Sequence, residues 1–408
     1  MSPPVSSDAD PSSPPLLLVR GGRVFAPEDL GRRDLLLGYG RILAIGDGLA
    51  TRFAPLGEIV PVEARGKLVV PGFIDQHLHL LGGGDFEGPL GRVPELHLSM
   101  VTRGGVTTVV GIMGIEIGFK TLHGLLVKAR ELDRSGLTTY IYTGAFGIPP
   151  PFLTTSVWAD LMLIDKVIGV KIAISDDAYP NLSLPDLARV AGEVRRAAGM
   201  TGKAAVIHAH VGRNPTRLQP VFDLLKAVSL PITQIVPTHV NRHRPDTLSH
   251  GIEFARLGGT IDFSANLSKR SGSLTGLDPD EAVKVARADG VPLSRITLSS
   301  DSNVSMPVLD AADRPVGLHN AHPTILHREF VHVVRTNDLA LPDALPLVTS
   351  NVARVLGIAD RKGSLRPGLD ADVVLLDPDL AVDTVIARGR LMVQAGRVVA
   401  HGPFEPSA

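Results

Sequence analysis

Short runs of apolar, often β-branched residues alternate with longer amphipathic segments between residues 71 and 360. The short runs are typical of buried strands, whereas the longer segments repeat apolar residues at helical spacing. The pattern predicts strands over Gly72–His79, Val106–Ile112, Thr138–Phe146, Val167–Ile174, Ala204–His210, Gln234–Val240, Gly259–Ser264 and Ile296–Ser300. The predicted helices are Leu122–Ser135, Pro185–Ala198, Leu218–Ser229, Leu248–Leu257, Pro279–Asp289 and a longer closing region, His322–Leu356.

This alternation favours an α/β fold in which eight parallel strands close into a (β/α)8 TIM barrel. An open, doubly wound sheet is the alternative. No GxGxxG motif follows any predicted strand, and Gly82-Gly-Gly84 opens a loop after a histidine-containing strand instead. The barrel over residues 71–360 is therefore the predicted architecture.

The two ends of the chain consist of shorter apolar runs that are punctuated by glycine. These runs predict strands at Leu16–Val24, Asp34–Ile45, Ala371–Leu376, Thr384–Arg388, Arg390–Val393 and Gly396–His401. We expect residues 16–70 and 361–408 to form one small β-sandwich, with the barrel domain inserted between them. Residues 1–15, rich in Pro, Ser and Asp, predict a disordered tail.

Composition narrows the chemistry that the chain can use. The 408 residues include 14 histidines and no cysteine, which excludes disulfides, thiolate metal ligands and a cysteine nucleophile. The net charge of −1 gives no indication of a nucleic-acid partner. No signal peptide or run long enough to span a bilayer stands out, so we expect a cytoplasmic protein without a membrane partner.

Polar side chains fall at the carboxyl ends of several predicted strands, where barrels place their chemistry. Each residue has an ordinary structural explanation when it is considered alone: a hydrogen-bonded histidine, an aspartate that caps a helix, or an interior His208. A lysine inside an apolar strand is harder to explain, because burial of its charge is costly. The side chains that gather at this one mouth are His77, His79, Lys171, His208, His210, His239 and Asp301.

Such a set suits a pair of divalent metal ions. A neutral buried Lys171 amine beside metals could react with CO₂, giving a carbamate that bridges two cations about 3.5–4 Å apart. One ion would lie among His77, His79 and Asp301, and the other between His210 and His239, with a hydroxide between the two. Asp301 is the expected catalytic residue, because it could orient this hydroxide and carry its proton to the leaving group.

The constellation resembles the amidohydrolase superfamily, and within it the isoaspartyl dipeptidase family. The matching segments are Pro71–Leu80 with Gly82-Gly-Gly84, Ile168–Asp176, Pro237–Arg242, Gly258–Asp262, Leu298–Asp301 and Ala387–Val393. The resemblance implies six metal ligands: His77, His79, Lys171 as N6-carboxylysine, His210, His239 and Asp301. It also implies that Arg242 and Ser305 contact a substrate carboxylate, that the Gly84 backbone contacts substrate, and that the two ions are zinc.

The pocket departs from this family at four positions. Phe86, with Glu87 next to it, stands where the family has a glutamate that binds the substrate's α-ammonium group. Phe146 replaces a tyrosine that polarises the scissile carbonyl. Ala178 replaces a second carboxylate-binding arginine, and Ile115 a threonine. A free β-aspartyl dipeptide would lose several polar partners in such a pocket.

We therefore expect a binuclear hydrolase of C–N amide bonds in a carboxylate-bearing small substrate: a dipeptide, an N-acyl amino acid or a cyclic amide. A β-aspartyl dipeptidase proper, a superfamily deaminase and a non-catalytic scaffold are the alternatives. Lys171 argues against a deaminase, because those sites usually use one metal without this lysine. The complete ligand set argues against a scaffold, and the resemblance implies a homo-oligomer.

Overall fold

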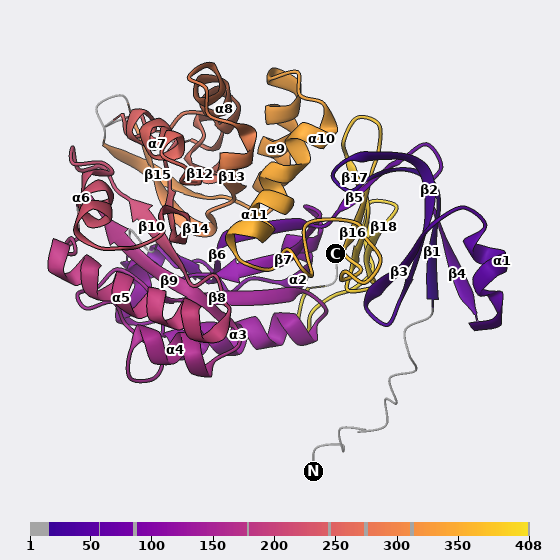
Figure 1. Cartoon of the computed structure of the whole chain (residues 1–408), viewed down its shortest axis with the longest axis horizontal. Coiled ribbons are helices and arrows are strands. Elements are labelled where there is room, and N and C mark those ends of the chain that lie inside the picture. Colours follow the sequence, from indigo (N-terminus) through magenta and orange to yellow (C-terminus); the bar gives the residue numbers. More distant parts are fainter. Residues whose placement is uncertain are drawn as a thin grey trace, which may run out of the picture.

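The computed structural model describes residues 16–56, 58–84, 88–177, 179–243, 246–272, 276–310 and 314–406. The predicted tail, Phe86, Glu87 and Ala178 lie outside these residues. The described fold is mixed α/β, with a curled and mostly parallel sheet at one end and a separate sheet from both chain ends at the other (Figure 1).

The curled sheet has eight strands in the order β11-β10-β9-β8-β7-β6-β14-β15, and β12 pairs with β13 in a separate parallel sheet. The neighbours from β6 to β11 are all parallel. Each lies within a few residues of its predicted position. The bounds are β6 Phe73–Gly83, β7 Val106–Gly111, β8 Thr138–Gly144, β9 Val167–Ile174, β10 Val206–Val211, β11 Ile235–Thr238, β12 Ile261–Ser264 and β13 Ile296–Ser299.

Two further strands that the sequence pattern did not predict extend the sheet beyond β6. They are β14 (Ser302–Leu309), which is parallel to β6, and β15 (Pro315–Asn320), which is antiparallel to β14.

The helices that follow the parallel strands match the predicted segments. The bounds are α3 Leu122–Arg134, α5 Leu184–Thr201, α6 Gln219–Ala227, α7 Thr247–Arg256 and α8 Pro279–Ala288, whereas the short helix α2 (Leu98–Thr102) was not predicted. The predicted closing region divides into α9 Ile325–Thr336, α10 Leu341–Ala344 and α11 Ser350–Val355, and a short unpredicted helix, α4, spans Val157–Leu163. Local signals set these ends: α5 begins with a Ser183–Asp186 capping box and ends at Gly202, whose φ is 72°.

The burial of strand β9 shows that the central sheet is covered on both faces. All eight of its residues are buried, which is typical of a parallel strand packed between helices. Lys171 is the one charged residue in this run, and its side chain is 1% exposed. The sheet therefore holds an amine in its interior.

The strands from the two chain ends form one hydrogen-bonded sheet, as the predicted union of the two ends requires, and its arrangement as a sandwich stays a prediction. It has nine strands, in the order β19-β18-β17-β16-β5-β1-β2-β3, with β4 paired to β1. The predicted strand Asp34–Ile45 is split by a turn at Tyr39 and Gly40. The bounds are β1 Leu16–Phe25, β2 Asp29–Gly38, β3 Arg41–Gly46, β4 Ile59–Glu63, β5 Leu68–Pro71, β16 Val373–Leu376, β17 Val382–Ala387, β18 Arg390–Gln394 and β19 Arg397–Val398.

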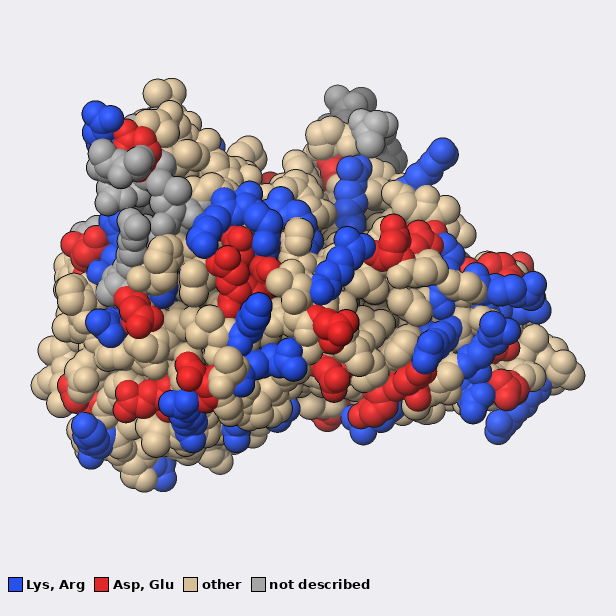
Figure 2. Space-filling model, turned by 90° about the horizontal axis from the view of Figure 1, so that it is seen from above, with Lys and Arg blue, Asp and Glu red and all other residues tan. Residues whose placement is uncertain are grey.

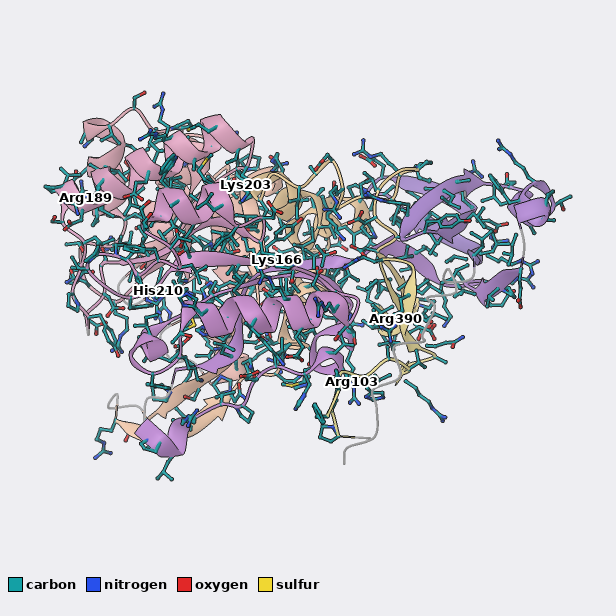
Figure 3. All side chains as sticks on the ribbon, turned by 90° about the horizontal axis from the view of Figure 1, so that it is seen from below. Arg103, Lys166, Arg189, Lys203, His210 and Arg390 are labelled. Carbon is teal, nitrogen blue, oxygen red and sulfur yellow. The ribbon has the colours of Figure 1, made fainter. Side chains whose placement is uncertain are left out.

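Strand β5 joins the two chain ends, because it pairs with β1 on one side and with β16 on the other. Helix α1 (Leu49–Phe53) covers part of this sheet, where Leu49 packs with Leu16, Leu18 and Leu36. Figure 3 shows Arg390 on this sheet, well away from His210 in the helix-covered part of the molecule.

Basic and acidic side chains are interspersed over the face seen in Figure 2, in keeping with a net charge of −1. Among the described residues, no helix is both long enough and apolar enough to cross a membrane.

A buried ion-pair cluster links the segment after α11 to the central sheet, and this cluster yields a stability prediction. Lys362 is 3% exposed and donates to Thr138 Oγ1 at 2.6 Å and to Asp372 Oδ2 at 2.5 Å. Lys362→Met would leave the buried Asp372 carboxylate without its cation, so we expect a loss of about 3–5 kcal/mol in the free energy of unfolding. Urea unfolding followed by circular dichroism measures this loss.

Arg33→Met is the matched control, because Arg33 and Asp47 form an exposed pair 3.9 Å apart. It should change the free energy of unfolding by less than about 1 kcal/mol. Equal effects of the two substitutions would contradict a structural role for the Lys362 cluster.

Candidate metal centre

Strand register brings the predicted ligands together at one end of the curled sheet. His77 and His79 lie one residue apart on β6 and face the same way. Lys171 on β9 is paired in register with His208 on β10. His239 directly follows β11 and Asp301 follows β13, where the Asp301 N–H donates to the His77 carbonyl at 3.0 Å.

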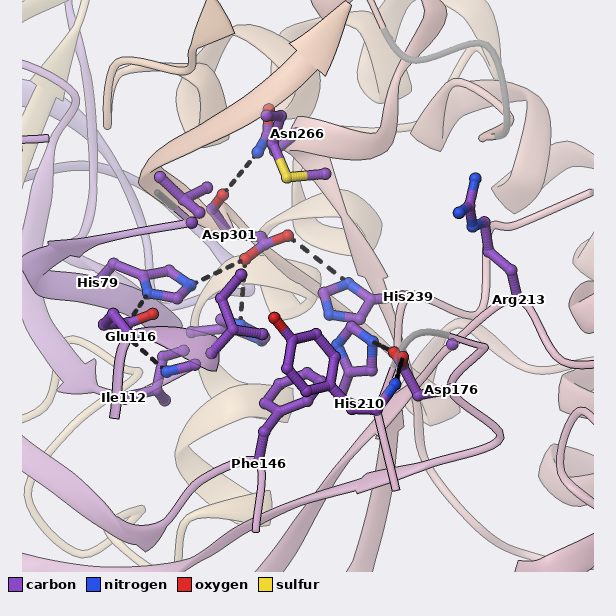
Figure 4. A pocket seen from close by; sticks show the side chains of 18 of the residues that line it. His79, Ile112, Glu116, Phe146, Asp176, His210, Arg213, His239, Asn266 and Asp301 are labelled. Carbon is purple, nitrogen blue, oxygen red and sulfur yellow. Dashed lines mark hydrogen bonds and ion pairs between the residues drawn. The ribbon is translucent and has the colours of Figure 1, made fainter. Parts of the chain in front are cut away.

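The carboxylate of Asp301 occupies the middle of this group, between His79 and His239 (Figure 4). Its Oδ1 lies 3.1 Å from His77 Nε2 and 3.5 Å from His79 Nε2, and its Oδ2 lies 3.7 Å from His239 Nδ1. Lys171 Nζ is 3.3 Å from His77 Nε2. The five side chains are buried, so their polar atoms face one another and not water.

His210 completes the set at the more open side of the centre. Its ring centroid lies 4.5 Å from that of His239, and its Nε2 is 3.2 Å from Asp176 Oδ2. Because Asp176 engages Nε2, Nδ1 is the nitrogen of His210 that remains for a metal ion.

Each of the other histidines also has a partner on one ring nitrogen. Glu116 Oε1 lies 3.4 Å from His79 Nδ1, Ser264 Oγ 2.7 Å from His239 Nδ1, and His208 Nε2 2.9 Å from His77 Nδ1. Such partners orient metal-binding imidazoles. Glu116 and Ser264 were not predicted from the sequence, although each is a polar residue close to the carboxyl end of a predicted strand, Glu116 shortly after β7 and Ser264 at the end of β12.

Burial controls the protonation of these groups. It lowers the pKa of His77 to about 3 and that of His210 to about 4, and it holds the pKa of His239 well below its ordinary value. Burial also works against the charge on His79, but Asp301 and Glu116 outweigh it and raise the pKa to about 9. Three of the four imidazoles are therefore neutral near pH 7, as metal ligands must be.

The lysine and the aspartate respond to burial in different ways. Burial lowers the pKa of Lys171 to about 7, so its amine is substantially neutral at physiological pH. Burial works against the Asp301 carboxylate, but the nearby His77 and His239 outweigh it and hold the pKa of Asp301 well below its ordinary value. The centre thus presents a fixed anion beside a neutral amine.

The donor set suits metal binding. Two buried groups of His and Asp have ligand atoms close enough to hold an ion: His77 with His239 and Asp301, and His77 with His208 and Asp262. The first group consists of predicted ligands, whereas the second includes His208 and Asp262, which are not in the predicted set. Imidazole nitrogens and carboxylate oxygens are common ligands of zinc and related divalent ions. The predicted ligands thus gather around one centre, while their individual roles stay predictions.

The backbone at two of these residues is strained. His239 has a φ of 67° and Asp301 a φ of 48°, in the left-handed region that side chains rarely adopt. Strained residues persist where the surroundings hold them and often mark functional sites. A sequence pattern carries no signal for this feature.

The pocket above the centre contains most of the predicted substrate contacts. Gly84, Phe146 and Arg242 line it, together with Ile115 and Met306. Arg242 is 7% exposed, its Nε donates to the Val211 carbonyl at 3.1 Å, and burial lowers its pKa to about 10, so it stays charged at neutral pH.

Ser305 lies behind Gly84, not among the residues that line the pocket. A Cβ on Gly84 would come within 2.0 Å of the Ser305 carbonyl oxygen, and the φ of Gly84 is 88°. This close approach requires glycine at position 84.

Comparisons with known proteins agree with this geometry. Residues 274–392 match the model of the amidohydrolase family. A crystal structure of β-aspartyl dipeptidase from Fervidobacterium islandicum AW-1, in complex with a β-Asp-Leu dipeptide, is 34% identical, with a TM-score of 0.84. The similarity covers 94% of this chain and 98% of the dipeptidase.

More distant relatives match over similar lengths. An imidazolonepropionase from Maricaulis maris is 24% identical over 89% of this chain and 94% of its own. A dihydroorotase from Pelotomaculum thermopropionicum is 26% identical over 95% of this chain and 96% of its own. With a 34% identical dipeptidase matched over 94% of its length, the chain belongs to the amidohydrolase superfamily.

Proposed function

We propose that this amidohydrolase cleaves a C–N amide bond in a small, carboxylate-bearing substrate at a binuclear metal centre. The observation that carries the proposal is the buried amine of Lys171, which lies 3.3 Å from His77 Nε2 and has a pKa lowered by burial to about 7. A neutral amine is the form that reacts with CO₂, so Lys171 is suited to become N6-carboxylysine, an anionic ligand.

The residues that would hold the two ions are those of the predicted set. His77, His79 and Asp301 would bind one, His210 and His239 the other, with carboxylated Lys171 shared between them. Zinc is the metal that the resemblance implies, and the nitrogen and oxygen donors are compatible with it. When bound, the two ions lower the pKa of water and polarise the amide carbonyl.

Asp301 is the proposed general base and acid. Its carboxylate stays ionised although it is buried, so it can accept a proton from the attacking water. The protonated Asp301 carboxyl group then delivers that proton to the amide nitrogen as the C–N bond breaks. The surrounding imidazoles hold Asp301 in place through contacts from β6 and from the end of β11.

The β12–β13 pair would close the curled sheet into a (β/α)8 barrel around this centre. Gln76 on β6 supports this closure, because its Nε2 donates to Asp262 Oδ1 on β12 at 2.7 Å and to Thr297 Oγ1 on β13 at 2.8 Å. The Val240 N–H, after β11, donates to the Asp262 carbonyl at 3.3 Å. If the barrel closes in this way, the barrel domain would span residues 71–360, and residues 16–70 and 361–408 would form the second domain.

Arg242 is the proposed anchor for the substrate carboxylate, since a buried guanidinium pairs strongly with a planar anion. The remaining wall is more apolar, with Phe146, Ile115 and Met306. N-acyl amino acids, modified dipeptides and cyclic amides fit such a pocket. The 34% identical dipeptidase, which binds β-Asp-Leu, favours β-aspartyl dipeptide hydrolysis as the second candidate.

Replacement of Lys171 tests the metal centre. Lys171→Ala removes the shared ligand, so we expect metal content to fall from about two ions per chain to one or fewer and amidase activity to fall at least a hundredfold. Elemental analysis and a hydrolysis assay measure the two effects. Lys269→Ala, an exposed lysine paired with Glu281, is the control. A variant that kept both ions would refute the bridging role of Lys171.

Replacement of Arg242 tests recognition of the carboxylate. Arg242→Met should lower kcat/KM for N-acyl amino acids about 10- to 100-fold, because a hydrogen bond to a charged group is worth about 1.5–3 kcal/mol. The matching N-acyl amino-acid amides should be affected much less. Arg213→Met, an arginine that pairs with Asp177 at the pocket rim, is the control. An equal loss for acids and amides would rule out Arg242 as the anchor.

Phe146 distinguishes the two candidate substrate classes. Its ring packs 4.8 Å from that of His210, so Phe146→Tyr would place a phenol beside the centre. If the missing hydroxyl limits β-aspartyl dipeptide hydrolysis, kcat for β-Asp-Leu should rise at least tenfold, while KM changes little. Fast turnover of β-Asp-Leu by the unchanged protein would show that the phenol is dispensable.

A further inference from the structure

His208 is the histidine of the cluster to which the proposed chemistry assigns no role. It is fully buried on β10, two residues before His210 and beside Lys171 in register. Its ring stacks on Tyr142, with centroids 5.0 Å apart and an interplanar angle of 18°. This stacking fixes the orientation of the His208 ring.

One contact connects His208 to the metal centre. Its Nε2 lies 2.9 Å from His77 Nδ1, and the two rings meet nearly edge to face, at 73°. Only one hydrogen atom fits between two nitrogens at this distance, so one ring donates and the other accepts.

The other side of the His77 ring decides the direction of this hydrogen bond. His77 Nε2 faces Asp301 and Lys171, and it is the nitrogen that would bind an ion. A neutral imidazole that binds metal through Nε2 keeps its hydrogen on Nδ1. His77 must then donate, and His208 Nε2 must accept.

Thr238 is placed to support the same tautomer. Its Oγ1 lies 3.5 Å from His77 Nδ1, and its hydroxyl donates to Asp262 Oδ2 at 2.7 Å. Asp262 also accepts from Ser299, Thr297 and Gln76. The Thr238 hydrogen is therefore committed to Asp262, and the neighbours of His77 Nδ1 are both acceptors.

We propose that His208 is a positioning residue that accepts the Nδ1 hydrogen of His77 and thereby presents Nε2 of His77 as an unprotonated metal ligand. The inference rests on the metal-dependent function proposed above. This hydrogen bond also explains, without an ion, why the polar atoms of His77, His208 and Asp262 lie close together. An ion there would require His77 to lose both ring hydrogens, and the Asp262 oxygens already accept four hydrogen bonds.

This arrangement couples the two rings. When His77 donates through Nδ1, a neutral His208 carries its own hydrogen on Nδ1, which has no hydrogen-bond partner among the described residues. Without an ion, the opposite tautomers are favoured: His208 Nε2–H donates to His77, and His77 Nε2–H donates to Asp301 Oδ1, 3.1 Å away. Metal binding therefore exchanges the tautomers of both rings without changing the number of protons that they hold.

Two substitutions at His208 separate its role as an acceptor from its volume. His208→Gln places an amide oxygen near the position of Nε2, whereas His208→Leu removes the acceptor. Zinc-loaded proteins are challenged with a chelator, and zinc affinity and release rate are measured. We expect the Leu variant to bind zinc about 10- to 100-fold more weakly and the Gln variant to stay within about threefold of the wild type.

The outcomes are distinguishable from those that test the proposed function. A wild-type chain that binds no metal refutes the proposed function itself. A wild type with two ions and a Leu variant of equal affinity overturns only the role of His208. A Gln variant that loses one ion completely makes His208 a direct ligand, which also overturns the proposal.

Nuclear magnetic resonance tests the tautomers even if the Leu variant does not fold. In the ¹⁵N-histidine-labelled wild type, zinc should move the His77 hydrogen to Nδ1 and leave His208 Nε2 as a bare acceptor. The His208 signals are assigned from their absence in the Gln variant. Unchanged tautomers on addition of zinc would overturn the proposal.

Discussion

The buried carboxylate of Asp301 is the group on which the arrangement of the centre depends. A charge in the protein interior must be compensated, and the nearby groups are imidazoles from β6 and from the end of β11. The Asp301 N–H also donates to the His77 carbonyl, which connects the segment after β13 to β6. The side-chain contacts and the backbone hydrogen bond thus act at the same residue. Together they hold Asp301 in a strained, left-handed backbone conformation.

Much of this arrangement could be predicted from local sequence. The run Val167–Ile174 is apolar except for Lys171, so its strand character and its unusual lysine were both visible. The parallel register then brings polar residues at several strand ends to one side. Five histidines, a lysine and an aspartate were therefore expected to meet, and the structure brings them together, with all but the half-buried His210 buried.

Features that depend on distant pairing were not predictable in the same way. β5 lies between β1 and β16, and such long-range pairing leaves no periodic signal, so the order of strands in the terminal sheet was not predicted. Helix α4 is short, and strands β14 and β15 mix polar with apolar residues. The partners of the histidine rings, such as Glu116 and Ser264, depend on side-chain positions that spacing alone does not fix.

The charge around the centre supports its loading with two dications. Asp301, Glu116 and Asp176 contribute carboxylates, and a carboxylated Lys171 would add a fourth negative charge. Two divalent ions would offset most of this negative charge, with Arg242 left to pair with the substrate carboxylate. Burial works against the charge on His79, but Asp301 and Glu116 outweigh it and raise the pKa of this imidazole to about 9, while burial keeps its neighbours His77 and His210 neutral. The carboxylates of Asp301 and Glu116 that favour this proton would also favour a divalent metal ion beside His79.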